Sequence, residues 1–71
     1  MRMYENAGAA LQRLLDGRGL TPVALAAATG IDTGMLRRIL SGRQKSISTR
    51  NLLAFSRFFG LSLMELIELF S

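Results

Sequence analysis

The sequence contains no cysteine and no histidine. Without cysteine the chain can form no disulfide, and without either residue type it lacks the common ligand sets for zinc. A domain of 71 residues buries only roughly 60% of the surface of its unfolded chain, so its core provides limited stability. Disulfides, metals and oligomerisation are the usual supplements. Oligomerisation remains, and the hydrophobic share of 49% agrees with it.

Long apolar segments are also missing. The longest apolar run, Val23 to Ala28, is far shorter than the ~20 residues of a membrane span, and the first five residues lack the apolar core of a signal peptide. We therefore expect a cytoplasmic protein without membrane contact. The chain also has no phosphate-binding glycine loop, and its five carboxylates are scattered. We expect no enzymatic activity, no cofactor, no metal and no small-molecule ligand.

Acidic residues are absent from the middle of the chain. The net charge is +4, and no aspartate or glutamate occurs between Thr33 and Met64. Six basic residues lie in this stretch: Arg37, Arg38, Arg43, Lys45, Arg50 and Arg57. Clustered basic charge is typical of a nucleic-acid interface, although a solvated basic face would have the same composition.

Glycines and helix-capping residues divide the chain into five predicted helices with no strand between them. Apolar residues at three- and four-residue spacing predict the first helix from about Glu5 to Asp16, ended by Gly17 and Gly19. The second is capped by Thr21, begins with Pro22 and stops at Gly30. The others are a helix capped by Asp32 that reaches about Ser41, one from about Ser48 to Gly60, and one from Leu63 to about Phe70 after the capping box Ser62-Leu63-Met64-Glu65. The predicted fold is all-α, a single domain over residues 1–71.

The segment from Thr21 to Arg43 has the spacing of a helix-turn-helix, with a turn at Gly30 and a second helix that ends at Gly42. With its surroundings it resembles the lambda-repressor/Cro-like (XRE) family, whose members have five helices in this order. The matching positions span roughly residues 7 to 67: Gly19-Leu20-Thr21, Leu25-Ala26, Gly30-Ile31, Leu36, Ile39, Gly42, Leu52-Leu53 and Phe59-Gly60-Leu61-Ser62. The resemblance implies a DNA-binding domain with its helix-turn-helix at about residues 21–41. An ordinary helical hairpin is the alternative.

The resemblance places the base-reading residues on the exposed half of the helix that follows Asp32. By position these are Thr33, Gly34, Arg37 and Arg38. An arginine can donate two hydrogen bonds to O6 and N7 of a guanine, a contact worth about 1–3 kcal/mol of discrimination. A phosphate contact is the alternative for either arginine. Gly34 costs roughly 1 kcal/mol relative to alanine inside a helix, and its missing side chain would let the helix approach DNA closely.

The loop after this helix and two helix caps are the predicted phosphate contacts, because they offer side-chain and backbone donors and a helix N-terminus attracts an anion. The predicted contacts are Thr21, Ser41, Gly42, Arg43, Gln44, Lys45 and Ser48. Loop charges that face only solvent are the alternative.

Two positions depart from the family pattern. Pro22 stands where many members have a glutamine that contacts a DNA phosphate, so this contact is lost. Leu15 and Leu40 stand where many members pair a buried arginine with a glutamate. Because both partners are apolar here, no charge is left alone in the core, and we expect the two leucines to pack against each other.

The predicted last helix carries more apolar residues than one face of a two-turn helix can turn inward. Some should be exposed in a monomer, and exposed apolar clusters usually mark an interface. We expect a homodimer whose interface includes Leu61, Leu63, Met64, Leu66, Ile67 and Phe70. The alternative is that these residues only close the core of the monomer.

The predicted function is a sequence-specific regulator of transcription, by resemblance a repressor. It would bind double-stranded DNA as a homodimer on a near-palindromic operator. The second hypothesis is a protein-interaction module, such as an antitoxin-like partner, that uses the apolar last helix and binds DNA weakly; Pro22 and Gly34 favour it. Salt separates the two, because phosphate-driven binding weakens steeply as salt rises and an apolar interface does not.

Overall fold

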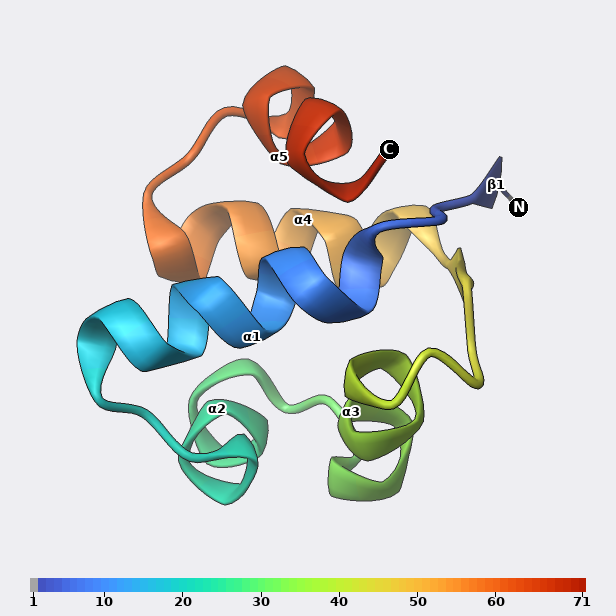
Figure 1. The fold of residues 1–71 in the computed structure, drawn as a ribbon. Coiled ribbons are helices and arrows are strands. Elements are labelled where there is room, and N and C mark those ends of the chain that lie inside the picture. Colours follow the sequence, from blue (N-terminus) through green and yellow to red (C-terminus); the bar gives the residue numbers. More distant parts are fainter. Residues whose placement is uncertain (1) are drawn as a thin grey trace.

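The computed structural model describes residues 2–71 and contains five helices (Figure 1). They are α1 (Ala7–Arg18), α2 (Pro22–Thr29), α3 (Thr33–Leu40), α4 (Thr49–Phe59) and α5 (Leu63–Phe70). The all-α class and the order of the helices are confirmed. α5 packs on α1 and α4, and these two helices separate it from α2 and α3 (Figure 1). None of the five helices is long and apolar enough to span a lipid bilayer.

Four helices begin at the predicted caps. The side-chain oxygens of Thr21, Asp32, Ser48 and Ser62 each accept a hydrogen bond of 3.0 to 3.2 Å from the backbone N–H three residues later. The Glu65 carboxylate accepts in return from the Ser62 N–H at 2.9 Å, which completes the capping box. The backbone bond and then the side-chain bond with Ser62 lower the pKa of Glu65. The carboxylate therefore stabilises the fold at and above its ordinary pKa, and this contribution disappears as the pH falls through the lowered value.

α1 differs from the prediction at both ends. It begins at Ala7, later than predicted, and continues through Gly17 to Arg18, so the prediction that Gly17 ends the helix is wrong. The helix ends at Gly19, whose φ of 62° is the left-handed conformation common at this position. The last turn is held by Arg18, whose Nη2 donates to the Phe59 carbonyl at 2.8 Å and whose guanidinium lies over the Phe59 ring.

A two-stranded ribbon, which the sequence did not predict, joins the N-terminal segment to the loop after α3. β1 (Arg2–Met3) pairs antiparallel with β2 (Ser46–Ile47). The Tyr4 N–H extends this pairing by donating to the Lys45 carbonyl at 2.7 Å. A strand of two residues has no measurable alternation of polar and apolar residues, so hydrophobic periodicity cannot reveal it.

The core is formed by all five helices, and its fully buried large side chains are Leu11, Leu15, Leu25, Leu36, Ile39, Phe55, Leu66 and Phe70. The ring of Phe70 meets those of Tyr4 and Phe55 edge to face, with centroids 6.3 and 6.0 Å apart. Leu15 is fully buried and Leu40 is half-buried against the core. Both positions are therefore apolar parts of the interior, and their mutual contact stays a prediction.

Two residues predicted for the dimer interface belong to this core instead. Leu66 and Phe70 are 0% exposed, so they cannot contribute contact surface in the folded monomer, and the prediction is wrong for them. They lie one helical turn apart and form the inward stripe of α5. Met64 is 71% exposed and Leu69 is 43% exposed. The other predicted interface residues are half-buried: Leu61, Leu63 and Ile67.

The close packing of α1 on α3 depends on Gly8. A Cβ at this position would lie 2.6 Å from the carbonyl oxygen of Ile39 and 3.0 Å from that of Leu40. Both oxygens belong to the backbone at the C-terminal end of α3, so they move only if the helix moves. Any side chain at position 8 would push α3 away from α1.

Candidate nucleic-acid interface

α3 has an apolar face and a basic face. Leu36 and Ile39 are fully buried, whereas Arg37 and Arg38 are exposed. Residues 34, 37, 38 and 41 are three or four positions apart and therefore lie together on the side away from the buried pair. We define the solvent face of α3 as Gly34, Arg37, Arg38 and the C-cap residue Ser41. Three of the four predicted base-reading residues thus share one surface, and Thr33 is half-buried at the first turn of the helix.

The two arginines of the solvent face have different surroundings. Arg38 donates from Nε to Oε1 of Gln44 at 3.2 Å. Within residues 2–71, no hydrogen bond or ion pair engages the side chain of Arg37. All five N–H donors of Arg37 are therefore available to a ligand, whereas Arg38 is oriented by a neighbouring side chain.

Gly34, in the N-terminal half of the solvent face, is closely bordered by two side chains. A Cβ there would lie 2.9 Å from Oδ2 of Asp32 and 3.5 Å from Nη1 of Arg38. Both atoms are ends of flexible side chains, unlike the backbone atoms that face Gly8. The Arg38 guanidinium thus extends back along α3 over Gly34, toward the carboxylate that caps the helix.

The loop after α3 folds back over the end of the helix. The N–H of Gly42 donates to the Ile39 carbonyl, and the N–H groups of Arg43 and Gln44 donate to the Arg38 carbonyl, at 3.0 to 3.1 Å. These bonds satisfy carbonyls that a helix end otherwise leaves without partners. The prediction that these loop N–H groups are available to phosphate is therefore wrong, and side chains remain as the donors of this segment.

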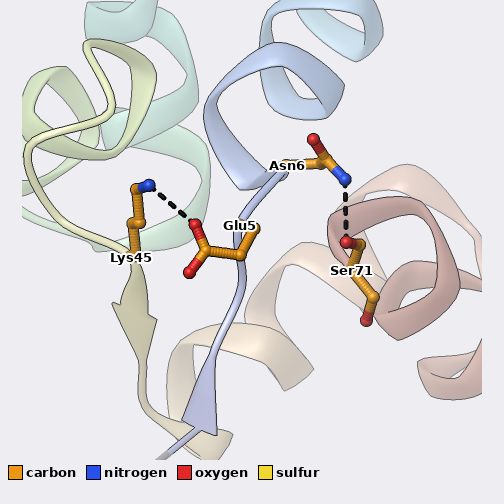
Figure 2. A network of polar contacts seen from close by, with 4 residues as sticks. All are labelled: Glu5, Asn6, Lys45 and Ser71. Carbon is orange, nitrogen blue, oxygen red and sulfur yellow. Dashed lines mark hydrogen bonds and ion pairs between the residues drawn. The ribbon is translucent and has the colours of Figure 1, made fainter.

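The side chains of the loop differ in their availability. Arg43 is exposed. Lys45 forms an ion pair with Glu5, with 2.7 Å between Nζ and Oε2 (Figure 2). Gln44 accepts from Arg38, as described above, and donates from Nε2 to the Ser46 carbonyl at 3.1 Å. The Ser41 hydroxyl donates to the Arg38 carbonyl at 3.1 Å, so of the four polar side chains predicted to bind phosphate here, three already have a partner within the chain.

The acidic partner of Lys45 lies in a segment that also contacts the end of α5. Figure 2 shows Glu5 beside the loop and Asn6 beside the last residue. The Asn6 amide donates from Nδ2 to the Ser71 carbonyl at 2.7 Å, and its backbone N–H donates to the Phe70 carbonyl at 2.9 Å. The N-terminal segment therefore joins the loop after α3 to the C-terminal helix.

Two predicted phosphate contacts lie at helix starts, Thr21 at that of α2 and Ser48 at that of α4. The hydroxyls of Thr21 and Ser48 accept a backbone N–H with the oxygen, which leaves the hydroxyl proton for a phosphate. Sequence reasoning did not single out Arg50, an exposed residue in the first turn of α4. Together with Asp32 and Met35 it lines a surface hollow of about 350 Å³ beside the start of α3. Its place in the acid-free basic stretch was the signal for it.

A profile of the helix-turn-helix family matches residues 11–66, which is most of the chain. The chain therefore belongs to the XRE-type (lambda-repressor/Cro-like) helix-turn-helix family, and the resemblance seen in the sequence is confirmed. It is a DNA-binding regulator of transcription. No curated protein matches the chain.

Two solved structures have a similar fold. The restriction-modification controller protein C.AhdI from Aeromonas hydrophila has a TM-score of 0.76 and 24% identity, over 87% of this chain and 92% of that chain. The clp gene regulator ClgR from C. glutamicum has a TM-score of 0.74 and 28% identity, over 92% of this chain and 83% of that chain. At 24% identity the likeness to C.AhdI concerns the fold alone.

Proposed function

We propose that the protein is a repressor that binds a near-palindromic operator as a homodimer, with α3 in the major groove. The observation that carries this proposal is the solvent face of α3, where Arg37 and Arg38 are exposed opposite the buried Leu36 and Ile39. The major groove admits one α-helix, and the paired donors of arginine match the two acceptors of guanine. The name of the similar structure at 28% identity, a gene regulator, supports a role in gene control.

In this proposal the phosphate contacts surround α3. The hydroxyls of Thr21 and Ser48 and the exposed guanidinium groups of Arg43 and Arg50 supply donors on either side of the helix. Lys45 contributes once DNA phosphate replaces its intramolecular carboxylate partner. Such contacts fix the position of the protein on the duplex without reading its sequence, and they make binding weaken as salt rises.

The homodimer of this proposal forms through one flank of α5. A continuous apolar strip lies beside the buried stripe of α5 and consists of Leu63, Met64 and Ile67. The first two are adjacent in sequence, and the third follows them by four and three positions, which places all three on one side of the helix. α1 and α4 separate α5 from α2 and α3, so a partner on this strip leaves the helix-turn-helix accessible (Figure 1). A protomer of 25 × 25 × 20 Å also suits two α3 helices about 34 Å apart, the spacing of successive major-groove faces.

Selection of binding sites from a random duplex library at two salt concentrations tests the DNA-binding part of the proposal. We expect the wild type to enrich a near-palindrome with half-sites about one helical turn apart, and Arg37→Ala/Arg38→Ala to lose it. Both side chains are exposed, so the double variant should unfold at the wild-type temperature. Equal, sequence-independent binding by both proteins would contradict sequence-specific regulation.

Sedimentation equilibrium tests the dimer. We expect the wild type to dimerise and Met64→Glu to be monomeric, because a charge buried in an apolar interface without a partner is costly. Leu69→Glu, on the other flank of α5, is the matched control and should leave the dimer intact. A wild type that stays monomeric at every concentration would favour the second candidate, a module whose exposed Met64 and Leu69 contact a different protein.

A further inference from the structure

The side chain of Arg38 is held in place by Gln44. Its Nε donates to Oε1 of Gln44 at 3.2 Å, although Arg38 itself is exposed. An exposed arginine ordinarily samples many rotamers, and this freedom is lost when it binds a base. A side chain that is oriented before binding loses less freedom on binding and favours one contact geometry over others.

Gln44 is in turn fixed on its other side. Its Nε2 donates to the Ser46 carbonyl at 3.1 Å, and its backbone N–H donates to the Arg38 carbonyl at 3.1 Å. Ser46 belongs to β2, which pairs with β1. Because Nε2 of Gln44 donates to the Ser46 carbonyl, the amide oxygen on the other side of the group faces Arg38. The two bonds together determine which way the amide points.

This contact leaves one edge of the Arg38 guanidinium for DNA. The group has five N–H donors, and Gln44 takes the one on Nε. The donors on Nη1 and Nη2 remain, and they form the end-on pair that fits O6 and N7 of a guanine. Nη1 lies over Gly34, 3.5 Å from where a Cβ would stand, so this edge belongs to the solvent face of α3.

We infer that Gln44 is a positioning residue that orients Arg38 to read a guanine in the operator. The inference rests on the proposed function, in which α3 enters the major groove. The amide oxygen and one N–H of Gln44 are engaged within the chain, and the second N–H of Nε2 remains for a phosphate, so the variants below separate the two roles. As a positioning residue, Gln44 acts on the discrimination between bases and leaves the general affinity for DNA unchanged.

A double-mutant cycle on the selected operator tests this role. Affinities are measured for the operator and for a duplex in which the guanine read by Arg38 is replaced. Gln44→Met, which keeps the length of the side chain without its amide, should lower the preference for guanine roughly 2- to 10-fold. Arg38→Ala should lower it about 5- to 150-fold. The double variant should be no worse than Arg38→Ala alone.

Two further variants separate positioning from phosphate binding and from folding. Arg43→Ala, next to Gln44 and exposed, should weaken binding to every duplex alike without changing the preference for guanine. Gln44→Glu keeps an acceptor oxygen for Nε but loses the N–H that bonds the Ser46 carbonyl, so it should keep only part of the preference for guanine while its charge lowers affinity for all duplexes. Thermal unfolding of each variant establishes that it is folded at the temperature of the binding assay.

The inference is overturned if Gln44→Met weakens all duplexes equally, since that is the behaviour of a phosphate contact. It is also overturned if the effects of Gln44→Met and Arg38→Ala on the preference for guanine add. A wild type that shows no sequence preference in the selection refutes the proposed function instead. The two failures are therefore read from different experiments.

Discussion

α3 is held by backbone atoms on one face and surrounded by side-chain ends on the other. Toward α1, position 8 has no room for a side chain because the Ile39 carbonyl lies 2.6 Å from where its Cβ would stand. On the solvent face, Gly34 is bordered by the Asp32 carboxylate and the Arg38 guanidinium, which are side-chain ends, each with one hydrogen bond to hold it. The packing of α3 on α1 therefore involves backbone oxygens, which move only with the helix. The groups on its solvent face are side-chain ends, which can change conformation while the helix stays in place. Stability and DNA recognition should respond to different substitutions.

Gly8→Ala breaks the packed face and should have the largest effect on stability. The added methyl group cannot be accommodated without moving α3, and such overpacking costs about 1–3 kcal/mol of the free energy of unfolding. In a domain of this size each kcal/mol lowers Tm by roughly 4–8 °C. Circular dichroism during heating measures the change, and operator affinity should fall with it.

Gly17→Ala is the matched control in the same helix. An added Cβ meets nothing within 4 Å there, so alanine should raise stability by about 0.5–1 kcal/mol through its lower conformational entropy in the unfolded chain. If Gly8→Ala and Gly17→Ala change Tm alike, the contact with α3 does not decide stability.

Gly34→Ala probes the solvent face and should affect DNA more than folding. The alanine gains roughly 1 kcal/mol of helix propensity, while the Asp32 oxygen that must shift is the one that caps α3 through the Met35 N–H, so the two effects on stability oppose each other. A methyl group between α3 and the groove should cost about 1–3 kcal/mol of binding, or about 5- to 150-fold in Kd. Titration of the operator, beside thermal unfolding, measures both quantities. An unchanged Kd would mean that DNA does not approach this end of the helix.

Glu5→Gln should strengthen DNA binding a few-fold with little change in stability. The ion pair with Lys45 is exposed, with side chains 65% and 41% accessible, and such pairs contribute about 0–1 kcal/mol to folding. Its removal frees Lys45 for a phosphate, so the slope of log K against log salt should steepen by about 0.9. Glu68→Gln removes the same charge from α5, away from α3, and should leave this slope unchanged.

Asp32→Asn should have the smallest effect. Asparagine and aspartate cap helices about equally well, so the bond to the Met35 N–H is kept and stability should change by only a few tenths of a kcal/mol. Loss of the negative charge beside the Arg38 guanidinium should raise operator affinity slightly. Asp32→Ala, which loses the cap, should lower stability by about 1 kcal/mol. Equal unfolding temperatures for the two variants would show that the cap contributes nothing.

Features governed by local chemistry could be predicted from the sequence. The caps at Thr21, Asp32, Ser48 and Ser62 are confirmed because a cap needs only a side-chain oxygen and an N–H three residues later. Helical spacing also predicts that Arg37 and Arg38 are exposed. The buried residues of the same helix, Leu36 and Ile39, lie on its opposite face. The same spacing shows that α5 has a buried stripe, but it does not show which of its apolar positions turn inward.

Features that depend on contacts between distant residues could not be predicted. Phe70 is buried because Tyr4 and Phe55 meet its ring, and the sequence gives no sign of either contact. In the sequence, Gly8 is only a residue of low helix propensity. Its role in packing becomes visible once the position of α3 is known. The bond between Arg38 and Gln44 depends on the path of the loop, which folds back over the end of α3.

The N-terminal segment ties the chain almost end to end without a covalent link, since Asn6 bonds to Ser71 and Tyr4 bonds to Lys45. Most contacts in a helical domain are local and form rapidly. The contacts of the N-terminal segment instead close long loops, and they form only at the cost of the entropy lost in that closure. We expect them to form last in folding and to open first in the native state. In hydrogen exchange, the amides of Tyr4 and Asn6 should then lose protection together and ahead of the core. A single local opening of this segment would therefore break its contacts with both the loop after α3 and the end of α5.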